Sequence, residues 1–405
     1  MHSRDLIEQY KTYVQDWRRY FHKHPELSNE EFETTKTLAK ELESMGVEVH
    51  VDTERGTGLI GIIHGAKSGK AIALRADIDA LPVQEHNTFD FKSDVDGKMH
   101  ACGHDGHMAI LLGAAKMLTA MKDRIEGDVY LAFQPAEETG AGAPDFMKFD
   151  HWFEKIDAIF GGHVWIDLPA GLISVEEGPR MAASSKITIR VKGKQGHGAQ
   201  PHQAIDAVVV ASAIVMNLQT VVSRNVSALD SLVLTIGNIH SGSEWNVIPG
   251  EAQMGGTIRF FDPAQEDHYV ESIRRVVEHT ALAYGATAEL IYEKKVPPTI
   301  NDAAASELAE RVVIDTLGKE KLSKMRKVMP GEDFAWYLQE KPGCFAFIGI
   351  QNSEVGATFD HHNNRFTMDD SILSAASAVY AEYAIAWLKA VSYTHLRAHE
   401  TKANL

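Results

Sequence analysis

The sequence lacks three features that mark other classes of protein. Its 405 residues include only two cysteines, Cys102 and Cys344, which argues against a disulfide framework. Basic residues are in deficit: 40 Lys and Arg oppose 56 Asp and Glu, and the formal charge of -16 disfavours a nucleic-acid partner. No stretch approaches an apolar membrane span, and no apolar signal core follows Met1. We therefore expect a cytoplasmic protein that binds neither nucleic acid nor membranes.

The length and the apolar pattern predict two domains. Helical periodicity covers 3–24 and 29–45, and Ser28 or Asn29 is expected to cap the second helix. Short apolar runs between helices indicate buried, largely parallel strands. They lie at 58–64, 71–75, 129–133, 156–160 and 344–350, and a helix over 369–388 follows the last run. This order is typical of an α/β domain with a mostly parallel sheet and helices on both faces.

The middle of the chain has a different order. Strands and helices follow one another as β-α-β-β-α-β, at 186–192, 205–222, 232–240, 252–261, 265–284 and 288–296. That order is the ferredoxin-like split βαβ pattern. We predict that residues 184–296 form a lid domain inserted into a discontinuous catalytic domain of residues 1–183 and 297–391. The polar tail at 392–405 is expected to be non-native or disordered.

A cluster of metal-binding side chains lies just before a predicted helix. The segment His100-Ala-Cys-Gly-His-Asp-Gly-His107 holds a thiol, three imidazoles and a carboxylate, with glycines that allow tight turns. A thiolate among imidazoles suits Zn, Mn, Co or Ni better than Ca or Mg. The pattern favours a metal site over a surface cluster of histidines.

Other polar residues follow the predicted strands of the same sheet. They are Asp77 with Asp79, Glu137 with Glu138, His163, and His361 with His362. Open α/β folds place their sites beyond the carboxyl ends of the strands, so we expect these residues to converge. In an adjacent pair of carboxylates, one can bind metal while the other takes a proton from water.

The predicted lid carries polar residues of its own. His197 lies in a glycine-rich loop after the first strand of the lid, and Asn246 and Arg259 follow later. An imidazole or a cation from a second domain can stabilise a developing oxyanion. A polar loop before a helix fits the same residues, so the pattern alone leaves both interpretations open.

Taken together, the motifs resemble the M20 metallopeptidases, in the amidohydrolase branch. That branch includes bacterial N-acyl-amino-acid and hippurate hydrolases and plant auxin-conjugate hydrolases. The resemblance extends from His22 to Leu388, with the motifs in the family's order. They are His22-Lys-His-Pro-Glu26, Arg75-Ala-Asp-Ile-Asp-Ala-Leu-Pro82, Met99–His107, Phe133-Gln-Pro-Ala-Glu-Glu138, Gly162-His-Val164, Gly196–His202, Asn246-Val-Ile-Pro249, Gly256-Thr-Ile-Arg259 and Gly331-Glu-Asp-Phe334.

The resemblance implies two divalent metal ions and a set of protein ligands for them. These ligands would be Cys102, His104, Glu138, His163 and His362. The chain departs from the family pattern at Asp77, where related branches have a histidine ligand, and at His361, where an apolar residue is usual. The choice of His362 over His361 therefore rests on the family match. The stretch 143–152 also departs from the family's small-residue pattern.

The resemblance also implies roles for residues that do not bind metal. Glu137 would be the general base, and His197 would polarise the scissile carbonyl, from its own chain or from a partner subunit. Asn246 and Arg259 match positions that contact the carboxylate or carbonyl of the substrate. Asp79 would orient a metal ligand from behind it.

The function implied is metal-dependent hydrolysis of the amide bond of N-acyl amino acids, such as N-acetyl or N-benzoyl conjugates, by a homodimer joined through the lid. The alternative is a dinuclear aminopeptidase or dipeptidase that acts on short peptides. A cysteine hydrolase with Cys102 as nucleophile would resist chelators. A metal-dependent binding protein would not be expected to retain Glu137.

Overall fold

The computed structural model describes the backbone of residues 1–403 and the side chains of residues 1–390. The chain forms two compact units. Unit 1 comprises Met1–Arg180, Ile300–Arg326 and Asp333–Leu405, and unit 2 comprises Met181–Thr299 and Lys327–Glu332. Unit 2 therefore includes the segment 327–332, which the sequence analysis assigned to the catalytic domain. The expectation for the tail at 392–405 falls outside the described side chains.

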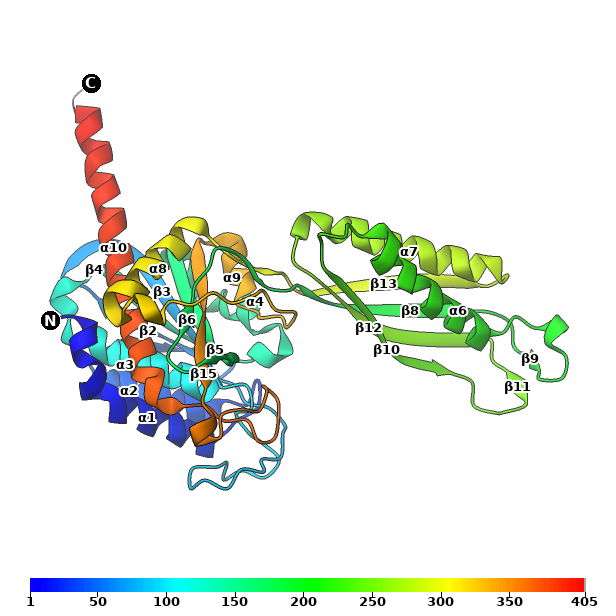
Figure 1. The fold of residues 1–405 in the computed structure, drawn as a ribbon, viewed down its shortest axis with the longest axis horizontal. Coiled ribbons are helices and arrows are strands. Elements are labelled where there is room, and N and C mark those ends of the chain that lie inside the picture. The colour runs from blue at the N-terminus through cyan, green and yellow to red at the C-terminus, as the bar shows by residue number, and fades with distance from the viewer. Residues whose placement is uncertain (404–405) are drawn as a thin grey trace. The chain divides into compact units, whose positions relative to one another are not determined.

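Unit 1 is built on a seven-stranded sheet in the order β1-β2-β4-β3-β5-β15-β6. Figure 1 shows several of these strands with the helices of the unit around them. The four strands β4, β3, β5 and β15 are parallel, whereas β2 and β6 run antiparallel to their neighbours. The carboxyl ends of the parallel strands therefore meet at one edge of the sheet. The strands are β1 (Glu48–Val51), β2 (Leu59–His64), β3 (Lys67–Asp77), β4 (Glu126–Gln134), β5 (Ala158–Pro169), β6 (Ile173–Ser174) and β15 (Gly343–Gln351).

Helices cover both faces of this sheet. A Cβ added at Gly161 of β5 would lie 2.6 Å from Phe334, beside α9, whereas one at Gly162 would lie 3.2 Å from Tyr380 of α10. Because successive residues of a strand point to opposite faces, α9 and α10 lie on opposite sides. The helices of unit 1 are α1 (Ile7–Lys23), α2 (Phe32–Ser44), α3 (His104–Ala120), α4 (Gly142–Phe146), α5 (Trp152–Lys155), α8 (Ala303–Leu317), α9 (Ala335–Glu340) and α10 (Leu373–Ala403).

The helix α3 occupies the centre of the larger core. It is buried along most of its length because α1 and α10 both pack against it. A helix that is covered on all sides is apolar all round, which is why α3 shows little amphipathic pattern. It begins at His104, so the packing of its apolar body fixes the position of the predicted metal cluster.

Unit 2 has the predicted β-α-β-β-α-β order. Its antiparallel sheet runs β10-β12-β8-β13, and the short pair β11-β9 lies outside it. Alternate residues of β8, Ile187, Ile189 and Val191, share one apolar core with residues of both helices. The elements of unit 2 are β8 (Ser184–Lys192), β9 (Gly196–His197), α6 (Ala207–Thr220), β10 (Leu232–Ser241), β11 (Val247–Ile248), β12 (Glu251–Phe260), α7 (Glu266–Ala283) and β13 (Thr287–Val296). The strands β7 (Gly178–Met181) and β14 (Thr299–Asn301) pair with each other, and most of their residues belong to unit 1.

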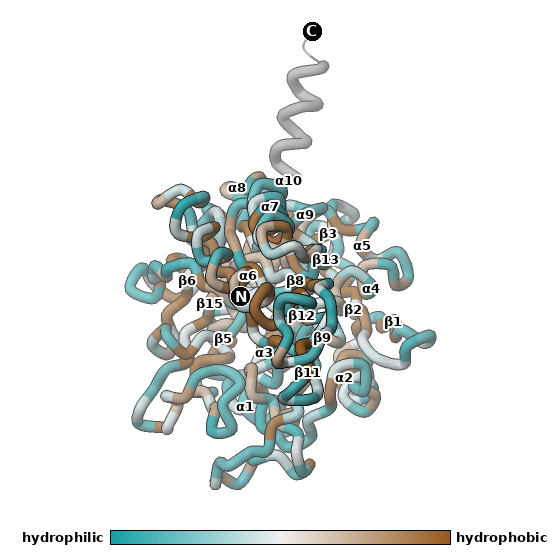
Figure 2. Tube along the Cα trace, turned by 90° about the vertical axis from the view of Figure 1, so that its right-hand side faces the viewer, coloured by the Kyte–Doolittle hydropathy of each residue, from teal (hydrophilic) through white to brown (hydrophobic). Residues whose placement is uncertain are grey.

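Two helical stretches are long and apolar enough to cross a membrane, contrary to the expectation that the chain has none. The stretch Asp370–Ala390 is 67% buried and belongs to the core of unit 1. The stretch Ala207–Asn225 is 33% buried and contains α6, most of which is apolar (Figure 2). Core helices of α/β proteins meet the same criteria of length and composition, so these two stretches are weak evidence for a membrane span.

Candidate metal centre

The residues predicted to bind metal come together in unit 1. They form three overlapping groups, in each of which the ligand atoms lie within 4.8 Å of one another: Cys102, His104 and His163; Cys102, Glu138 and His362; and His104, Glu137 and Glu138. Because the groups share Cys102, His104 and Glu138, they make one continuous site. All five predicted ligands and the predicted base belong to it.

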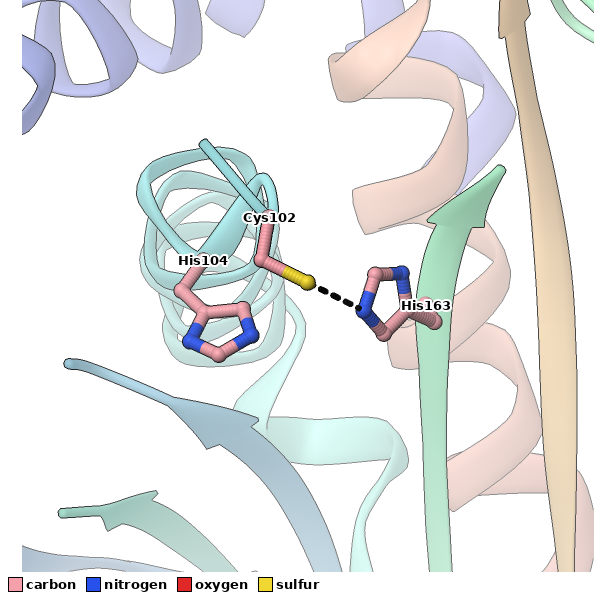
Figure 3. A group of neighbouring side chains, drawn as sticks. All are labelled: Cys102, His104 and His163. Carbon is pink, nitrogen blue, oxygen red and sulfur yellow. Dashed lines mark hydrogen bonds between the residues drawn. The ribbon is translucent and has the colours of Figure 1, made fainter. Parts of the chain in front are cut away.

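Cys102 and His104 flank a glycine that the geometry requires. Figure 3 shows both side chains at the start of α3, with the Cys102 side chain directed at His163 of β5 and its Sγ 3.4 Å from His163 Nε2. Gly103 between them has φ +96°, and a Cβ there would lie 2.4 Å from the side chain of Val164. Glycine adopts this conformation without penalty and leaves room for β5, so α3 can begin this close to the strand.

His163 lies inside β5 rather than after it. The apolar run predicts a strand that ends at residue 160, but β5 continues to Pro169 because β15 pairs with it in parallel, with His163 opposite Phe347. The central position holds the imidazole more firmly than a loop would. His163 Nδ1 lies 2.6 Å from the carbonyl oxygen of Val164 and donates to it, so Nε2 is left to face Cys102.

His104 is oriented in the same way. Its Nδ1 lies 2.9 Å from the carbonyl oxygen of Asp79 and 3.2 Å from Asp79 Oδ1. Both atoms are acceptors, so Nδ1 carries a proton and Nε2 is the nitrogen left to bind a metal ion. Asp79 Oδ2 also accepts from the backbone N–H of Glu138 at 3.0 Å. Asp79 therefore fixes two of the predicted ligands from behind, as the resemblance implies.

Two buried atoms at the centre of the site have no hydrogen-bond partner among the described residues. They are His104 Nε2 and Glu138 Oε1, which lie 3.9 Å apart. Buried polar atoms nearly always have a hydrogen-bond partner, so an unpaired imidazole nitrogen beside an unpaired carboxylate oxygen needs an explanation. Two ligand atoms that face a shared cation give this spacing. The residues present therefore fit a metal ion.

His362 is placed by its backbone. It has φ +65°, and its N–H donates to the carbonyl of Ala101 at 2.8 Å. This brings its Nε2 to 3.5 Å from Glu138 Oε1. The neighbouring His361 instead directs Nε2 to the carbonyl oxygen of Val164 at 2.9 Å. Of the two histidines, only His362 directs a ring nitrogen at another predicted ligand. The left-handed backbone conformation of His362 costs about 1–3 kcal/mol, because it is not a glycine.

The site contains an excess of buried negative charge. Burial lowers the pKa of His104, but Asp77 and Asp79 outweigh burial and raise that pKa to about 10. Burial, together with the charges of Glu138 and Glu137, raises the pKa of the Cys102 thiol well above its usual range. The carboxylates thus stabilise a positive charge here, whereas Cys102 is not an activated thiolate, as a cysteine hydrolase would require.

Asp77 lies beside the metal ligands, and both of its carboxylate oxygens have partners within the protein. Its Oδ1 lies 2.5 Å from His107 Nδ1, and its Oδ2 accepts from Arg75 Nη1 at 2.8 Å. Asp77, His104 and His107 also form a group with metal-binding spacing. However, His107 Nε2 already accepts from the N–H of Val164 at 2.9 Å. Both nitrogens of His107 are therefore occupied within the protein.

Arg75 links Asp77, at the end of β3, to Gln134 and Asp333. It donates to Asp333 Oδ1 at 2.9 Å and to Gln134 Oε1 at 2.8 Å, in addition to its bond with Asp77. The backbone N–H of Asp333 lies 3.3 Å from Glu137 Oε1 and donates to it. Sequence reasoning missed these roles, although Arg75 and Asp333 stand in two of the motifs that carried the resemblance.

The start of α3 is anchored by a second buried network. Asp105, in the first turn of α3, accepts from His22 Nδ1 at 2.8 Å and lies 3.0 Å from Arg18 Nε. His22 in turn lies 3.1 Å from Glu85. All four side chains are buried. Asp105 therefore ties α3 to α1 instead of capping its own helix.

The predicted lid residues all lie in unit 2, at two different places. His197 of β9 pairs with Val247 of β11, and the N–H of Gly198 donates to the carbonyl of Asn246 at 2.8 Å, so His197 and Asn246 are neighbours. Arg259 lies at the other end of β12. Its Nη1 is 3.4 Å from the carbonyl oxygen of Met329.

Comparison with known proteins identifies the family. Residues 73–386 match the model of peptidase family M20/M25/M40. An N-acetylcysteine deacetylase of Bacillus subtilis is 41% identical over 386 residues, 94% of this chain and 98% of the relative. A thermostable carboxypeptidase of Saccharolobus solfataricus is 37% identical over 390 residues, with 94% and 98% covered. A solved dinuclear metal binding peptidase of the M20 family from Bacillus subtilis matches with a TM-score of 0.84 at 37% identity, covering 94% of this chain and 99% of that one.

The chain therefore belongs to peptidase family M20/M25/M40, as the resemblance implied. It is a hydrolase of amide bonds whose family includes enzymes with two metal ions per site. The expected fold class, a mixed α/β domain with a mostly parallel sheet, is confirmed by the same structural match.

His100 yields a prediction about stability. It is buried, neither ring nitrogen has a hydrogen-bond partner in the described part of the chain, and burial lowers its pKa to about 4. The unfolded chain binds a proton near pH 6.5 and the folded chain does not, so this group removes stability as the pH falls from 6.5 towards 4. The shift corresponds to at most about 3 kcal/mol.

We expect His100→Met to increase the free energy of unfolding of the metal-free protein, and to increase it more at pH 5 than at pH 8. Urea unfolding at both pH values measures the difference. An equal effect at the two pH values would contradict a neutral, buried His100.

Proposed function

We propose that this protein hydrolyses the amide bond of N-acyl amino acids, releasing a carboxylate and a free amino acid, with two divalent metal ions bound by Cys102, His104, Glu138, His163 and His362. The observation that carries the proposal is the convergence of these five side chains around unpaired buried atoms, with Glu137 beside them. When bound, the ions supply Lewis acidity, which favours attack by water at neutral pH. Mn, Zn, Co and Ni all suit this mixture of thiolate, imidazole and carboxylate.

Glu137 acts as the general base. Asp333 N–H holds its Oε1, and its Oε2 lies 4.0 Å from His104 Nε2, so the second oxygen faces the ligands. A carboxylate in this position takes a proton from the attacking water and returns it to the leaving amine. Glu138, next in the sequence, has its N–H bound by Asp79 and its carboxylate directed at His104 and His362. The adjacent carboxylates thus have different tasks.

Arg259 binds the carboxylate of the substrate. Its guanidinium is half-buried, and among the described residues no carboxylate pairs with it. Burial lowers its pKa because the charged form loses solvent. A half-buried guanidinium that has only a carbonyl oxygen as partner is suited to bind an anion from outside the chain. An N-acyl amino acid and the C-terminus of a peptide both offer such a carboxylate.

Hydrolysis of peptides from their C-terminus is the second candidate. It is favoured by the 37% identity to a thermostable carboxypeptidase, whereas the 41% identity to an N-acetylcysteine deacetylase favours removal of an acyl group. Both reactions leave a free amino acid whose carboxylate would bind Arg259. They differ only in what lies on the acyl side. An aminopeptidase, which binds a free amino group, is the less favoured alternative.

His197 is supplied by the partner subunit of a homodimer. Within unit 2, His197 and Arg259 lie near opposite ends of β12. Glu251, at the first end, pairs with Lys192, which precedes the loop that carries His197, whereas Ile258, next to Arg259, pairs with Ser185 at the other end. At the usual rise per strand residue, Glu251 and Arg259 are about 26 Å apart. One small substrate cannot span that distance, so the two groups that contact it come from different chains.

Unit 2 also offers a surface for such a dimer. The helix α6 exposes Val208, Val209 and Met216, with 44%, 48% and 70% of their surfaces accessible. The neighbouring β10 is an edge strand of the sheet and exposes Ile239. An apolar helix beside an unpaired edge strand is the kind of surface that a second copy covers.

Cys102 and Cys344 are both free thiols, which supports a reducing, cytoplasmic location.

A substrate panel tests the function. We expect N-acetyl or N-benzoyl amino acids to be cleaved faster than an N-blocked peptide or a free dipeptide. A chelator should abolish the activity, and Mn, Zn, Co or Ni should restore it. Faster release of the C-terminal residue from the N-blocked peptide would establish the carboxypeptidase instead, and activity that survives the chelator would refute the metal centre.

Replacement of the base tests its role. We expect Glu137→Gln to lower kcat by about two to four orders of magnitude while bound metal is unchanged, because the amide cannot accept a proton. Glu138→Gln, its matched control, should instead lower the bound metal, measured by elemental analysis. Wild-type turnover in Glu137→Gln would remove Glu137 from the mechanism.

Mixing two inactive variants tests the dimer. His197→Ala and Glu137→Gln should each be nearly inactive alone. When they are refolded together in equal amounts, each mixed dimer regains one complete site, so activity should recover to about a quarter of the wild-type value. If His197 acted within its own chain, mixing would restore nothing.

A further inference from the structure

A buried carboxylate outside the metal cluster lies against the segment that carries Glu137 and Glu138. Glu31 immediately precedes α2, and its side chain is fully buried. Its Oε1 accepts a hydrogen bond from the backbone N–H of Ala136 at 2.8 Å. Glu31 and Ala136 are far apart in the sequence, so this bond joins α2 to the end of β4.

Glu31 is not needed to cap its own helix. No side-chain bond from it reaches the first turn of α2. That task falls to Glu26, whose carboxylate accepts from the N–H groups of Thr34 at 2.7 Å and Glu33 at 3.2 Å. Ser28, one of the two expected caps, donates to Asp79 instead. The Glu31 side chain is therefore directed at Ala136 for some purpose other than the stability of α2.

Ala136 is the residue at which the chain turns from β4 into the two glutamates. It has φ +58° and ψ +37°, the left-handed conformation that a residue with a Cβ rarely adopts. Both of the next two residues are held by hydrogen bonds: Asp333 N–H donates to Glu137 Oε1, and the N–H of Glu138 donates to Asp79. The bond from Glu31 fixes the turn that comes before both.

The second oxygen of Glu31 makes a purely structural role a poor explanation. Glu31 Oε2 is buried, and no hydrogen bond of good geometry reaches it within the described part of the chain, although the backbone N–H groups of Asn29 and Glu31 lie close to the carboxylate. Burial, with the charge of Asp79, raises the pKa of this carboxyl to about 7. A group selected only for stability would not leave one oxygen buried and unpaired, and such exceptions concentrate at functional sites.

We propose that Glu31 is a positioning residue for hydrolysis: by holding the N–H of Ala136, it fixes the left-handed turn that places Glu137 Oε2 beside the metal ligands. Glu31 contacts neither substrate nor metal. The proposal rests on the proposed function, because the group that is positioned is the general base of that reaction. What matters in Glu31 is the reach of an acceptor atom to Ala136, rather than the negative charge.

Two substitutions separate reach from charge. Glu31→Gln keeps an oxygen at the same reach and removes the charge, so we expect kcat within about threefold of wild type. Glu31→Asp keeps the charge but is one methylene too short, so we expect kcat to fall by about a hundredfold, the effect of a misplaced catalytic group. In both variants KM and bound metal should stay unchanged.

Glu26→Asp is the matched control. It shortens a carboxylate at the same helix by the same methylene, but that carboxylate binds only the first turn of α2. We expect it to leave kcat unchanged and to weaken α2 alone.

Hydrogen exchange on the metal-free protein gives a readout that needs no activity. In Glu31→Asp, the peptide that covers Ala136 should exchange faster while the start of α2 stays protected. In Glu26→Asp, the start of α2 should exchange faster and the Ala136 peptide should not change. Equal protection of Ala136 in Glu31→Asp and wild type would overturn the proposal.

The kinetic results can also overturn it. An active Glu31→Asp beside an inactive Glu31→Gln would show that charge is what matters. Loss of bound metal in step with kcat would show that Glu31 acts on a metal ligand. If the wild-type protein cleaves no member of the substrate panel, the proposed function fails, while the exchange experiment still decides whether Glu31 holds the turn.

Discussion

Mutual repulsion among buried carboxylates is the constraint on which this site depends. Asp77, Asp79, Glu137 and Glu138 gather around His104, and the first two are fully buried. A buried charge without a counter-charge is very costly, so this arrangement is stable only with positive charge close by. The Arg75 guanidinium supplies part of this positive charge through its ion pair with Asp77, and a protonated His104 supplies more in the metal-free protein. Divalent cations complete the balance when they bind.

The same constraint explains how precisely the ligands are held. An imidazole with freedom to rotate would turn away to find a hydrogen-bond partner, and in His104 and His163 the Nδ1 atom is held by a backbone carbonyl oxygen. The backbone of Val164 serves three rings: its N–H donates to His107, and its carbonyl oxygen accepts from both His163 and His361. The backbone of β5, fixed in the middle of a sheet, is thus the reference for three imidazoles.

Much of this arrangement was predictable, because the ligands follow strands and the strands are apolar runs. The sequence located the strands before Asp77, Glu137 and His361, and parallel packing made their ends converge. It ended β5 too early, because pairing with β15 across a long stretch of sequence extends that strand past His163. The sequence also could not show the bond of Glu31 to Ala136, since two residues so distant share no local pattern. Left-handed φ angles at Ala136 and His362 likewise have no signature in an alanine or a histidine.

The distance along β12 between the surroundings of His197 and Arg259 has a consequence for how this protein responds to dilution. If a partner subunit completes the site, as proposed above, turnover depends on association as well as on folding. Below the dissociation constant of the dimer, each chain would keep its fold, its metal ligands and its base, and would still lose its oxyanion donor. The specific activity would then rise with protein concentration. A small change in the amount of enzyme in the cell would change the flux through the reaction more than proportionally.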